Sequence, residues 1–597
     1  MICRLSMRYI LVFSLLALIV GAACTPRRDI GNTLRVAQRE KIKTLDPAHA
    51  NDFFSGTAVR RTYEGLYQYH YLKRPYEVVP NIAAAMPAIS ADGKTYTIRL
   101  KQDVYFQDDA CFPEGKGRRV VAKDFIFSWM RLADPKTASE VWWALDGRIV
   151  GLNEWREKLK QGDANSGTSH YDLPVEGLKA IDDFTLEVRL TREDPLFIHM
   201  LTMPATTVLA REAAEKYGQD LTTRSVGTGP FVLERFEQNQ IIWTRHPKYR
   251  LETYPSEGEA GDREAGLLAD AGKPIPFVDR IIDDVISEDQ PAWLNFQQNN
   301  HDYLVKIPKD NAKNILTDDF KPTREVSERG MKLLSSPGVE FSYIAFNQTD
   351  PVVGGPKRKF LRQAMSLAYD EAPTIGMFYL GLGKKAESMI PPGVFGYDSE
   401  YKNKYREFNV AKAQELLAKN GFPEGKGLPE LTYDLRSDPT ARQVAEYFVR
   451  SMAKIGIRIK LNQVSWPELN SRIAKKQAQV WGGIVWVYDY PDPENGLQLL
   501  YGPREAPGSN KTSYKNPAYD VLFEKFIRTR DDKERLALIK RMRSIYEEDV
   551  PWIVAVHRNE NRLTHSWLHN LKVHAFEYNS DKYLRVDAEA RKRVLER

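Results

Sequence analysis

The chain has 597 residues, of which 42% are hydrophobic and 28% charged, with 37 Gly, 34 Pro and 3 Cys. This composition excludes collagen, a small disulfide-held protein and an intrinsically disordered chain. Its 86 Lys and Arg against 80 Asp and Glu give a net charge of +6. Since the two signs alternate along the chain, we expect no nucleic-acid partner. At about 150 residues per domain, the length predicts several domains.

The first 23 residues are typical of an export signal. Arg4 and Arg8 precede an apolar run, 9–23, that is too short to cross a bilayer comfortably. Gly21-Ala-Ala-Cys24 at its end resembles the lipobox of bacterial lipoproteins, in which the cysteine is lipidated. We therefore predict a signal peptide at 1–23 and lipidation of Cys24. Ordinary signal-peptidase cleavage and an uncleaved anchor are the alternatives.

Loss of the signal would leave Cys111 as the only free thiol, so no intramolecular disulfide is expected. No basic neighbour is placed to activate Cys111. We therefore expect a bystander rather than a nucleophile.

The N-terminal third predicts short strands around one helix. Asp92-Gly93 and Asp182-Asp183 are turn signals between alternating apolar and polar residues, and the second pair predicts a hairpin. The expected strands are 33–37, 95–100, 178–181 and 185–190, and helical spacing predicts a helix over 122–132. This part of the chain is mixed α/β.

Residues 250–275 are rich in glycine and charge and predict a surface insertion. Beyond about 340, strands and helices alternate, which favours βαβ units and a largely parallel sheet. Helices are predicted around Leu361 to Ala368, from Asn409 to Gly421, and from Asp438-Pro439 to just before Gly456. The expected strands are 431–435, 457–464 and 480–487.

Motifs of enzymes and metal sites are missing from the sequence. Gly227-Thr-Gly-Pro-Phe231 lacks the Lys-Ser/Thr of a P-loop and the third glycine of a dinucleotide fingerprint. There is no Gly-x-Ser-x-Gly, His-Glu-x-x-His or Cys-x-x-Cys. His565 and His569 stand at helical spacing without an acidic third ligand. We expect no catalysis, no cofactor and no bound metal.

The most informative segment runs from Trp481 to Asn495. An apolar strand ends there, Asp489 follows among Trp486, Tyr488 and Tyr490, and two prolines force a turn. Ligands of open parallel sheets bind beyond the carboxyl ends of the strands, and a half-buried carboxylate there favours a cationic partner. The residues alone leave Asp489 as either a cation-binding group or a turn cap, and they give Asp492 the capping role.

Taken together, the motifs identify a resemblance to the extracytoplasmic solute-binding proteins of family 5, the oligopeptide/dipeptide class that serves ABC importers. It covers essentially the whole mature chain. The matching pieces include Leu45-Asp-Pro47, Tyr63-Glu-Gly-Leu66, Asp92 to Leu100, Ala122 to Trp129, Asp134 to Ala138, Gly227 to Phe231, Phe346-Asn347, Ile390-Pro-Pro392, Asp489 to Pro493, and Asn510 before Tyr514 to Pro517.

The resemblance implies an α/β protein with the two-lobed periplasmic-binding-protein fold, type II and similar to cluster C, with an additional mixed α/β domain. The ligand would be buried between lobes that close on it. The implied division is lobe I at 32–64, 211–337 and 553–590, the additional domain at 65–210, and lobe II at 338–552. Gly227 to Phe231 would then be structural.

The resemblance also implies roles for individual residues. Asp489 would hold the ammonium group of a peptide, Trp486 would border a side-chain pocket, and Val487 would offer backbone hydrogen bonds. Asn510 would add a polar contact. The opposing lip would include Asn51 and Phe53, and His557 stands where the family often has an aromatic facing the cleft. Some members carry an Arg six residues before the acid, for the ligand carboxylate, but this chain has Gly483 there.

The function so implied is that of a non-catalytic, monomeric, lipid-anchored periplasmic receptor that delivers peptides to an inner-membrane ABC permease with its ATPase subunits. Three alternatives stay open. One is a family member that binds a nickel chelate, a sugar or another solute. Another is a sensor or chaperone-like protein without transport, and the third is an exported hydrolase.

Overall fold

A computed structural model describes residues 32–161, 169–308, 311–319, 321–506, 508–576 and 579–596. The predicted signal peptide at 1–23 and the predicted lipidation site Cys24 lie outside these residues. Within them, no helix combines the length and apolar character needed to cross a membrane.

Lobe I is built on an eight-stranded sheet assembled from distant parts of the chain, with the order β14-β21-β13-β1-β12-β9-β8 and β16 paired to β21. β1 is parallel to β12 and β13, and all other neighbours are antiparallel. The strands are β1 (Thr33–Gln38), β8 (Phe231–Phe236), β9 (Gln240–Arg245), β12 (Arg280–Val285), β13 (Tyr303–Leu304), β14 (Lys332–Pro337), β16 (Gly383–Lys385) and β21 (Val556–Thr564). The helices beside it are α2 (Phe53–Thr62), α7 (Asp289–Gln297), α8 (Ala312–Ile315), α9 (Arg324–Glu328) and α18 (Ala588–Leu595).

Lobe II contains a five-stranded sheet with the order β18-β17-β19-β15-β20. Its strands are β15 (Glu340–Phe346), β17 (Leu431–Arg436), β18 (Ile459–Val464), β19 (Val480–Val487) and β20 (Trp552–Val554). Its helices are α10 (Lys359–Leu367), α11 (Ala372–Tyr379), α12 (Val410–Lys419), α13 (Pro439–Ala453), α14 (Trp466–Ala474), α15 (Glu494–Leu497), α16 (Pro517–Phe526) and α17 (Asp532–Asp549).

The expectation of a largely parallel sheet holds for only part of lobe II. β18, β17 and β19 are parallel, as their helical crossovers require, whereas β15 runs antiparallel to both β19 and β20. β15 and β20 are the strands by which the chain enters and leaves this lobe, so no helical crossover fixes their direction.

Local capping explains why the predicted helices form where they do. The Asn409 side chain accepts a hydrogen bond from the Lys412 amide at the start of α12. Asp438 accepts one from the Ala441 amide at the start of α13, with Pro439 as the first helical residue. Both predicted helix starts are confirmed.

The additional domain has an antiparallel sheet with the order β4-β5-β7-β6. The predicted hairpin and the predicted helix over 122–132 are confirmed as β6–β7 and α3. The elements are β4 (Ala88–Ile89), β5 (Thr95–Arg99), β6 (Leu178–Asp182), β7 (Thr185–Arg189), α3 (Ala122–Ala133), α4 (Leu152–Lys160), α5 (Phe197–Met200) and α6 (Arg211–Tyr217). A short pair, β2 (Tyr67–Tyr69) and β3 (Val78–Pro80), precedes them.

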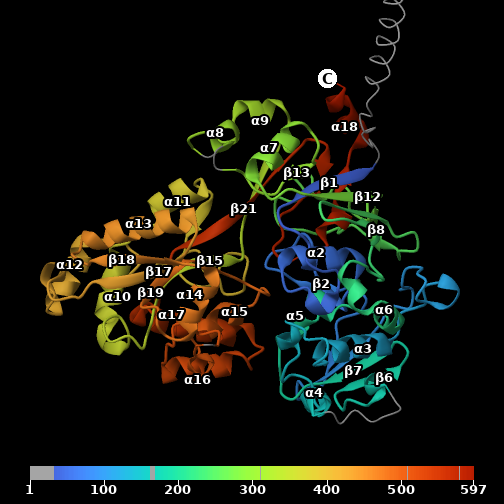
Figure 1. Cartoon of the computed structure of the whole chain (residues 1–597), viewed down its shortest axis with the longest axis horizontal. Helices are drawn as coiled ribbons and strands as arrows, with labels where there is room; N and C mark the ends of the chain where they lie inside the picture. Colours follow the sequence, from blue (N-terminus) through green and yellow to red (C-terminus); the bar gives the residue numbers. More distant parts are fainter. Residues whose placement is uncertain are drawn as a thin grey trace, which may run out of the picture.

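Two continuous segments connect the lobes. β14 leads into β15 through residues 338–339, and β20 leads into β21 through Ala555. In Figure 1, β21 bridges the yellow and orange lobe II and the remainder of the molecule. β16 comes from the stretch 338–552 but pairs with β21 of the lobe I sheet, so a third segment lies at this connection. We propose the boundaries given above as the domain division, with β16 as an exception.

The segment 250–275 is not simply a surface insertion. It contains β10 (Glu252–Thr253) and β11 (Pro274–Ile275), and Asp262 and Asp270 are buried within it. Lys572 bonds to Asp262 at 2.8 Å, and Arg585 bonds to Asp270 at 2.7 Å. Ion pairs therefore fasten this segment to the C-terminal part of the chain.

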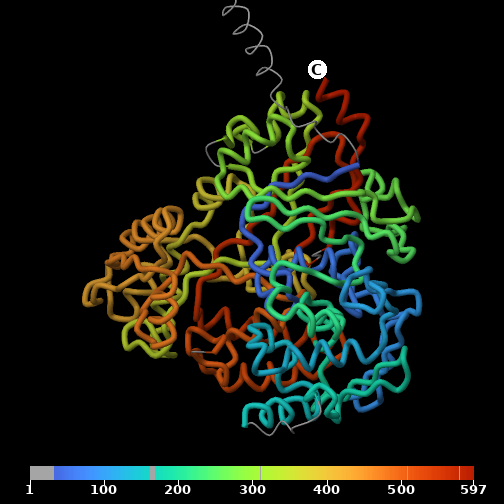
Figure 2. The backbone as a smooth tube through the Cα atoms, turned by 45° about the vertical axis from the view of Figure 1, so that its right-hand side comes forward, coloured from blue at the N-terminus to red at the C-terminus, as the bar shows by residue number. Residues whose placement is uncertain are grey.

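The C-terminal part also reaches the first strand. The Arg591 guanidinium of α18 donates to the Thr33 carbonyl of β1 at 2.9 Å, and the blue and dark red segments lie together at the top of Figure 2. A last strand pair, β22 (Leu568–His569) and β23 (Arg585–Val586), precedes α18.

The glycines of Gly227 to Phe231 have the expected structural role. A Cβ on Gly227 would lie 1.7 Å from the Thr62 carbonyl oxygen, and one on Gly229 would lie 2.5 Å from that of Arg61. Only glycine permits this approach of the chain to the end of α2.

Candidate functional site

The loop after β19 presents an ionisable group without a counter-ion. Asp489 is exposed, and among the described residues its side chain receives one hydrogen bond, from the Asn495 amide at 3.2 Å. Among the described residues it has no ion-pair partner. Although the residue is exposed overall, desolvation by neighbouring protein atoms raises the pKa of its carboxyl above the ordinary value, and the Asn495 bond acts in the opposite direction.

Asn495 connects Asp489 to the neighbouring tryptophan. Its side-chain oxygen accepts the Trp486 indole N–H at 2.8 Å, while its side-chain nitrogen donates to Asp489. Asn495 is fully buried in α15, so it fixes both groups from behind. Sequence reasoning missed this residue, because an Asn after two prolines is ordinary in a turn.

Other side chains hold the loop in place. The Tyr488 hydroxyl donates to the Met389 carbonyl at 2.8 Å. One Asp492 oxygen accepts the Glu494 amide at 2.9 Å, and the other accepts from Arg535 at 2.6 Å. Asp492 therefore has the predicted capping role. Tyr490 is buried and stacks on His199 of the additional domain, with 5.9 Å between ring centroids.

The strand before the loop has one uncovered edge. β15 pairs with β19 from Val480 to Val487, but β17 pairs with it only as far as Gly482. Among the described residues, no strand lies on that edge from Ile484 to Val487. Val487 is 60% exposed. Main-chain groups along this edge can receive an extended chain.

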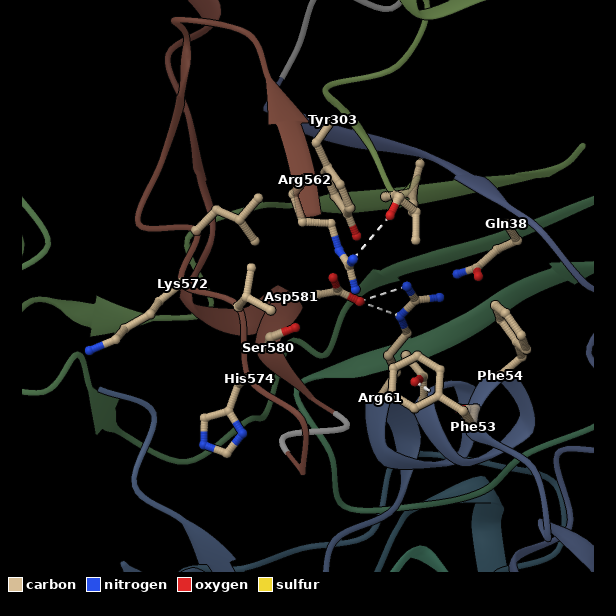
Figure 3. A pocket seen from close by; sticks show the side chains of 15 residues that line it. Gln38, Phe53, Phe54, Arg61, Tyr303, Arg562, Lys572, His574, Ser580 and Asp581 are labelled. Atoms are coloured by element: carbon tan, nitrogen blue, oxygen red, sulfur yellow. Dashed lines mark hydrogen bonds and ion pairs between the residues drawn. The ribbon is translucent and has the colours of Figure 1, made fainter. Parts of the chain in front are cut away.

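The predicted lip residues Asn51 and Phe53 lie at the start of α2. Asn51 donates a side-chain hydrogen bond to Glu140 of the additional domain. Phe53 is 48% exposed. It lines a cavity of about 70 Å³ together with Phe54, Arg61 and Tyr303, among others (Figure 3). Cationic Arg562 and Lys572 also line this lobe I pocket.

The charges beneath the pocket are neutralised. Arg61 is 1% exposed and donates to Asp581 at 2.6 Å and to both oxygens of Asp283. Figure 3 shows the Arg61 guanidinium directed at Asp581. This triad holds α2 against β12 and the C-terminal segment, so its charges are engaged within the protein.

Two predicted contact residues are buried elsewhere. Asn510 is fully buried, and its side chain bonds to the Tyr501 and Tyr514 carbonyls, the Thr512 hydroxyl and the Tyr514 amide. Since its hydrogen-bonding groups are occupied within the loop, we do not retain its side chain as a ligand contact.

His557 is 2% exposed at the start of β21, and its Nδ1 donates to the Glu340 carbonyl at 2.8 Å. Burial lowers its pKa to about 4. The ring therefore stays neutral at the connection between the lobes. The structure groups Trp486, Val487 and Asp489 on one segment of lobe II, and it places Asn51 and Phe53 at the start of α2. Glu340, which accepts the His557 hydrogen bond, is paired with Val487 across β15 and β19, so His557 lies next to the first group. The Asn510 side chain bonds within its own loop.

Comparison with known proteins gives consistent results. A family model described as "Bacterial extracellular solute-binding proteins, family 5 Middle" matches residues 77–508. The chain is 23% identical over 529 residues to glutathione-binding protein GsiB of Salmonella paratyphi A, covering 87% of this chain and 88% of that protein. It is 26% identical over 513 residues to di/tripeptide-binding protein 1 of Pseudomonas aeruginosa, covering 84% and 85%.

Heme-binding protein A of Haemophilus influenzae is 26% identical over 481 residues, covering 79% of this chain and 77% of that protein. The solved structure of HbpA2 from Haemophilus parasuis superposes with a TM-score of 0.72 at 22% identity, covering 93% of this chain and 100% of that one. The predicted two-lobed fold is thereby confirmed. The chain belongs to the bacterial extracellular solute-binding proteins of family 5.

Proposed function

We propose that this protein is a periplasmic substrate-binding lipoprotein of an ABC importer and that it captures peptides through their ammonium group at Asp489. The unpaired Asp489 carboxyl is the observation that supports this most directly. A carboxylate surrounded by protein on several sides is stabilised by an incoming cation, and a charge-assisted hydrogen bond contributes about 1.5–3 kcal/mol.

The uncovered edge of β19 supports a peptide as the ligand. An extended peptide lying along Ile484 to Val487 would exchange main-chain hydrogen bonds and gain affinity without reading side chains. Trp486, half-buried beside this edge, would border one side-chain pocket. The names of two relatives, a glutathione binder and a di/tripeptide binder, agree with a ligand that carries a free ammonium group.

The remaining parts of the proposal follow from the class. The protein would be held to the membrane through Cys24, act as a monomer and deliver its ligand to a permease with ATPase subunits. The heme-binding relative favours one alternative, an anionic ligand without an ammonium group.

Calorimetry with a matched set of ligands tests the proposal. After removal of co-purified ligand, a tripeptide, its N-acetylated form and hemin are titrated into the wild type, Asp489→Asn and Glu468→Gln. Glu468 is exposed on α14 of the same lobe and controls for the loss of one carboxylate. We expect acetylation and Asp489→Asn each to weaken binding about 10- to 100-fold, and Glu468→Gln to leave it unchanged. Binding of hemin alone would overturn the proposal, and so would equal affinity for both peptides.

A further inference from the structure

The additional domain and lobe II contact each other although no segment of chain leads directly from one to the other. With the division proposed above, the additional domain is continuous with lobe I at both of its ends, and lobe II is continuous with lobe I through β14–β15 and β20–β21. In Figure 1, α5 of the additional domain lies beside α15 of lobe II. The contact between the two can therefore form or break as lobe II moves on its connection to lobe I.

Three stacked rings form the centre of this contact. His199 of α5 stacks on Tyr490 of lobe II, with 5.9 Å between ring centroids, and on Tyr69 of β2, with 6.0 Å. The interplanar angles are 18° and 23°, and the His199 Nδ1 lies 3.0 Å from the Tyr69 hydroxyl oxygen. Stacked aromatic pairs contribute more than the area they bury, so His199 joins the two tyrosines into one unit.

Each side also places one tyrosine in the buried cluster of the other. Tyr490 is 4% exposed and belongs to the cluster built mostly from the additional domain. Tyr69 is 3% exposed and belongs to the cluster built mostly from lobe II. Since both rings would gain contact with water if the two parts separated, burial of apolar surface favours the arrangement in which they touch.

An ion pair provides a second point of contact. Arg530, in the turn between α16 and α17, pairs with Glu193 of the additional domain at 2.7 Å. The Arg530 guanidinium also lies against Gly93, where a Cβ would collide with it. The two charged side chains are 42% and 36% exposed. Charge attraction therefore adds to the ring stack, at positions where a substitution should leave the folded core intact.

Little space remains between the two surfaces near this ion pair. A cavity of about 20 Å³, with room for about one water molecule, is lined from both sides. Its lining includes Glu193, Asp194 and Leu196 of the additional domain and Glu494, Arg504 and Ile527 of lobe II. The additional domain and lobe II are thus closely fitted here.

The contact reaches the proposed ligand site through the loop after β19. Tyr490 directly follows Asp489, and its hydroxyl donates to Glu494 of α15. The next residue of α15, Asn495, donates to Asp489. Movement of Tyr490 away from His199 would therefore displace the loop that carries Asp489.

Contacts of this kind act on affinity through the population of one arrangement. They exist only while lobe II lies against the additional domain, so they stabilise that arrangement alone. A ligand held between the lobes binds more tightly as this arrangement becomes more populated, even though the contacts do not touch the ligand.

We propose that Tyr69, His199, Tyr490, Glu193 and Arg530 form a latch that holds lobe II against the additional domain and slows the escape of a ligand bound at Asp489. The latch itself is argued from the contacts between the two domains. Its effect on a ligand rests on the proposed function.

The ion pair allows a charge-reversal test. Arg530→Glu and Glu193→Arg each bring like charges together, whereas the double variant restores an opposite pair. Ligand-free proteins are measured by small-angle X-ray scattering, and tripeptide binding by calorimetry. Each single variant should show a larger radius of gyration and about 2- to 10-fold weaker binding, and the double variant should recover toward the wild type. Lys419→Glu, at an exposed site on α12 of lobe II, makes the same change of charge as Arg530→Glu and should behave as the wild type.

The stacked rings allow a second test. His199→Leu removes both stacked pairs and should weaken tripeptide binding about 2- to 10-fold, and His199→Phe, which keeps a ring, should weaken it less. Single charge variants that match the wild type in both scattering and affinity overturn the latch, and so does a double variant that recovers neither. A wild type that binds no peptide overturns the proposed function instead, and scattering of the ligand-free variants then decides on the latch alone.

Discussion

The two lobes handle carboxyl groups in opposite ways. In lobe I, Asp283 is completely buried, but Arg61 bonds to both of its oxygens and also to Asp581. In lobe II, Asp489 is more accessible, and within the described part of the chain its side chain has only the Asn495 amide as a partner. Burial alone therefore does not separate the two carboxyl groups, whereas the absence of a counter-ion among the described residues distinguishes Asp489 from Asp283.

This comparison has a physical basis. A complete buried ion pair satisfies its own charges and holds elements together. Asp489 has no ion-pair partner among the described residues, and desolvation raises the pKa of its carboxyl above the ordinary value. Mutation of the Arg61 triad should accordingly lower stability, whereas mutation of Asp489 should weaken ligand binding.

The largest effect is expected from Arg61→Met. This change leaves Asp283 and Asp581 buried without their cation, and breaking a buried pair in this way costs about 3–5 kcal/mol. Calorimetric unfolding should show a lower melting temperature. If Arg61→Met were as stable as the wild type, the Arg61 triad would not stabilise lobe I.

The second largest effect is expected from Asp489→Asn, which should weaken peptide binding. The pH dependence of the affinity should differ between the wild type and this variant. In the proposed function only the ionised carboxyl binds the ammonium group, so wild-type affinity should fall by up to about tenfold per pH unit as pH drops below the raised pKa of Asp489. The Asn variant should bind weakly and show no such dependence. A pH profile shared by both proteins would assign the titration to another group.

The Asp489→Asn substitution should also affect stability. The pKa of Asp489 is raised in the folded state, so the carboxyl contributes stability in acid, and this is lost as pH rises from the unfolded value through the folded one. At pH 7, Asp489→Asn should therefore melt at the same or a higher temperature than the wild type. A clear drop would instead assign Asp489 to capping the turn.

A smaller effect is expected from Asn495→Leu. The substitution removes the bonds to Trp486 and Asp489 while keeping a branched side chain with the same number of heavy atoms. We expect a loss of about 1–2 kcal/mol in unfolding free energy and a reduction in peptide affinity below that of Asp489→Asn. Tryptophan fluorescence and calorimetry measure the two effects. Unchanged affinity would show that Asn495 does not position the site.

The smallest effect is expected from mutation of Cys111, which is distant in sequence from both Arg61 and Asp489. Burial and a hydrogen bond to Asp109 raise the pKa of its thiol to about 12. The native protein should therefore react slowly with a thiol reagent at pH 8 and rapidly once unfolded, and Cys111→Ser should leave peptide binding unchanged. Rapid reaction of the native thiol would contradict its burial.

Much of the fold could be predicted because its signals are local. Asn409 and Asp438 cap helices whose first amides are three residues away, and the turn at Asp182-Asp183 pairs strands directly beside it. The antiparallel course of β15 could not be predicted in this way, since it depends on β19 and β20, which are distant in the chain.

The sequence by itself determined the placement of Asp489 at the end of a strand, the capping role of Asp492 and the family to which the chain belongs, because neighbouring residues and collinear motifs carry this information. Only the tertiary structure decided which charges are paired. Arg60 and Arg61 are adjacent and chemically identical, but the chain brings Asp283 and Asp581 to Arg61, whereas no carboxylate among the described residues pairs with Arg60. Counter-ions arrive through long-range packing, and a linear pattern of residue types does not contain that information.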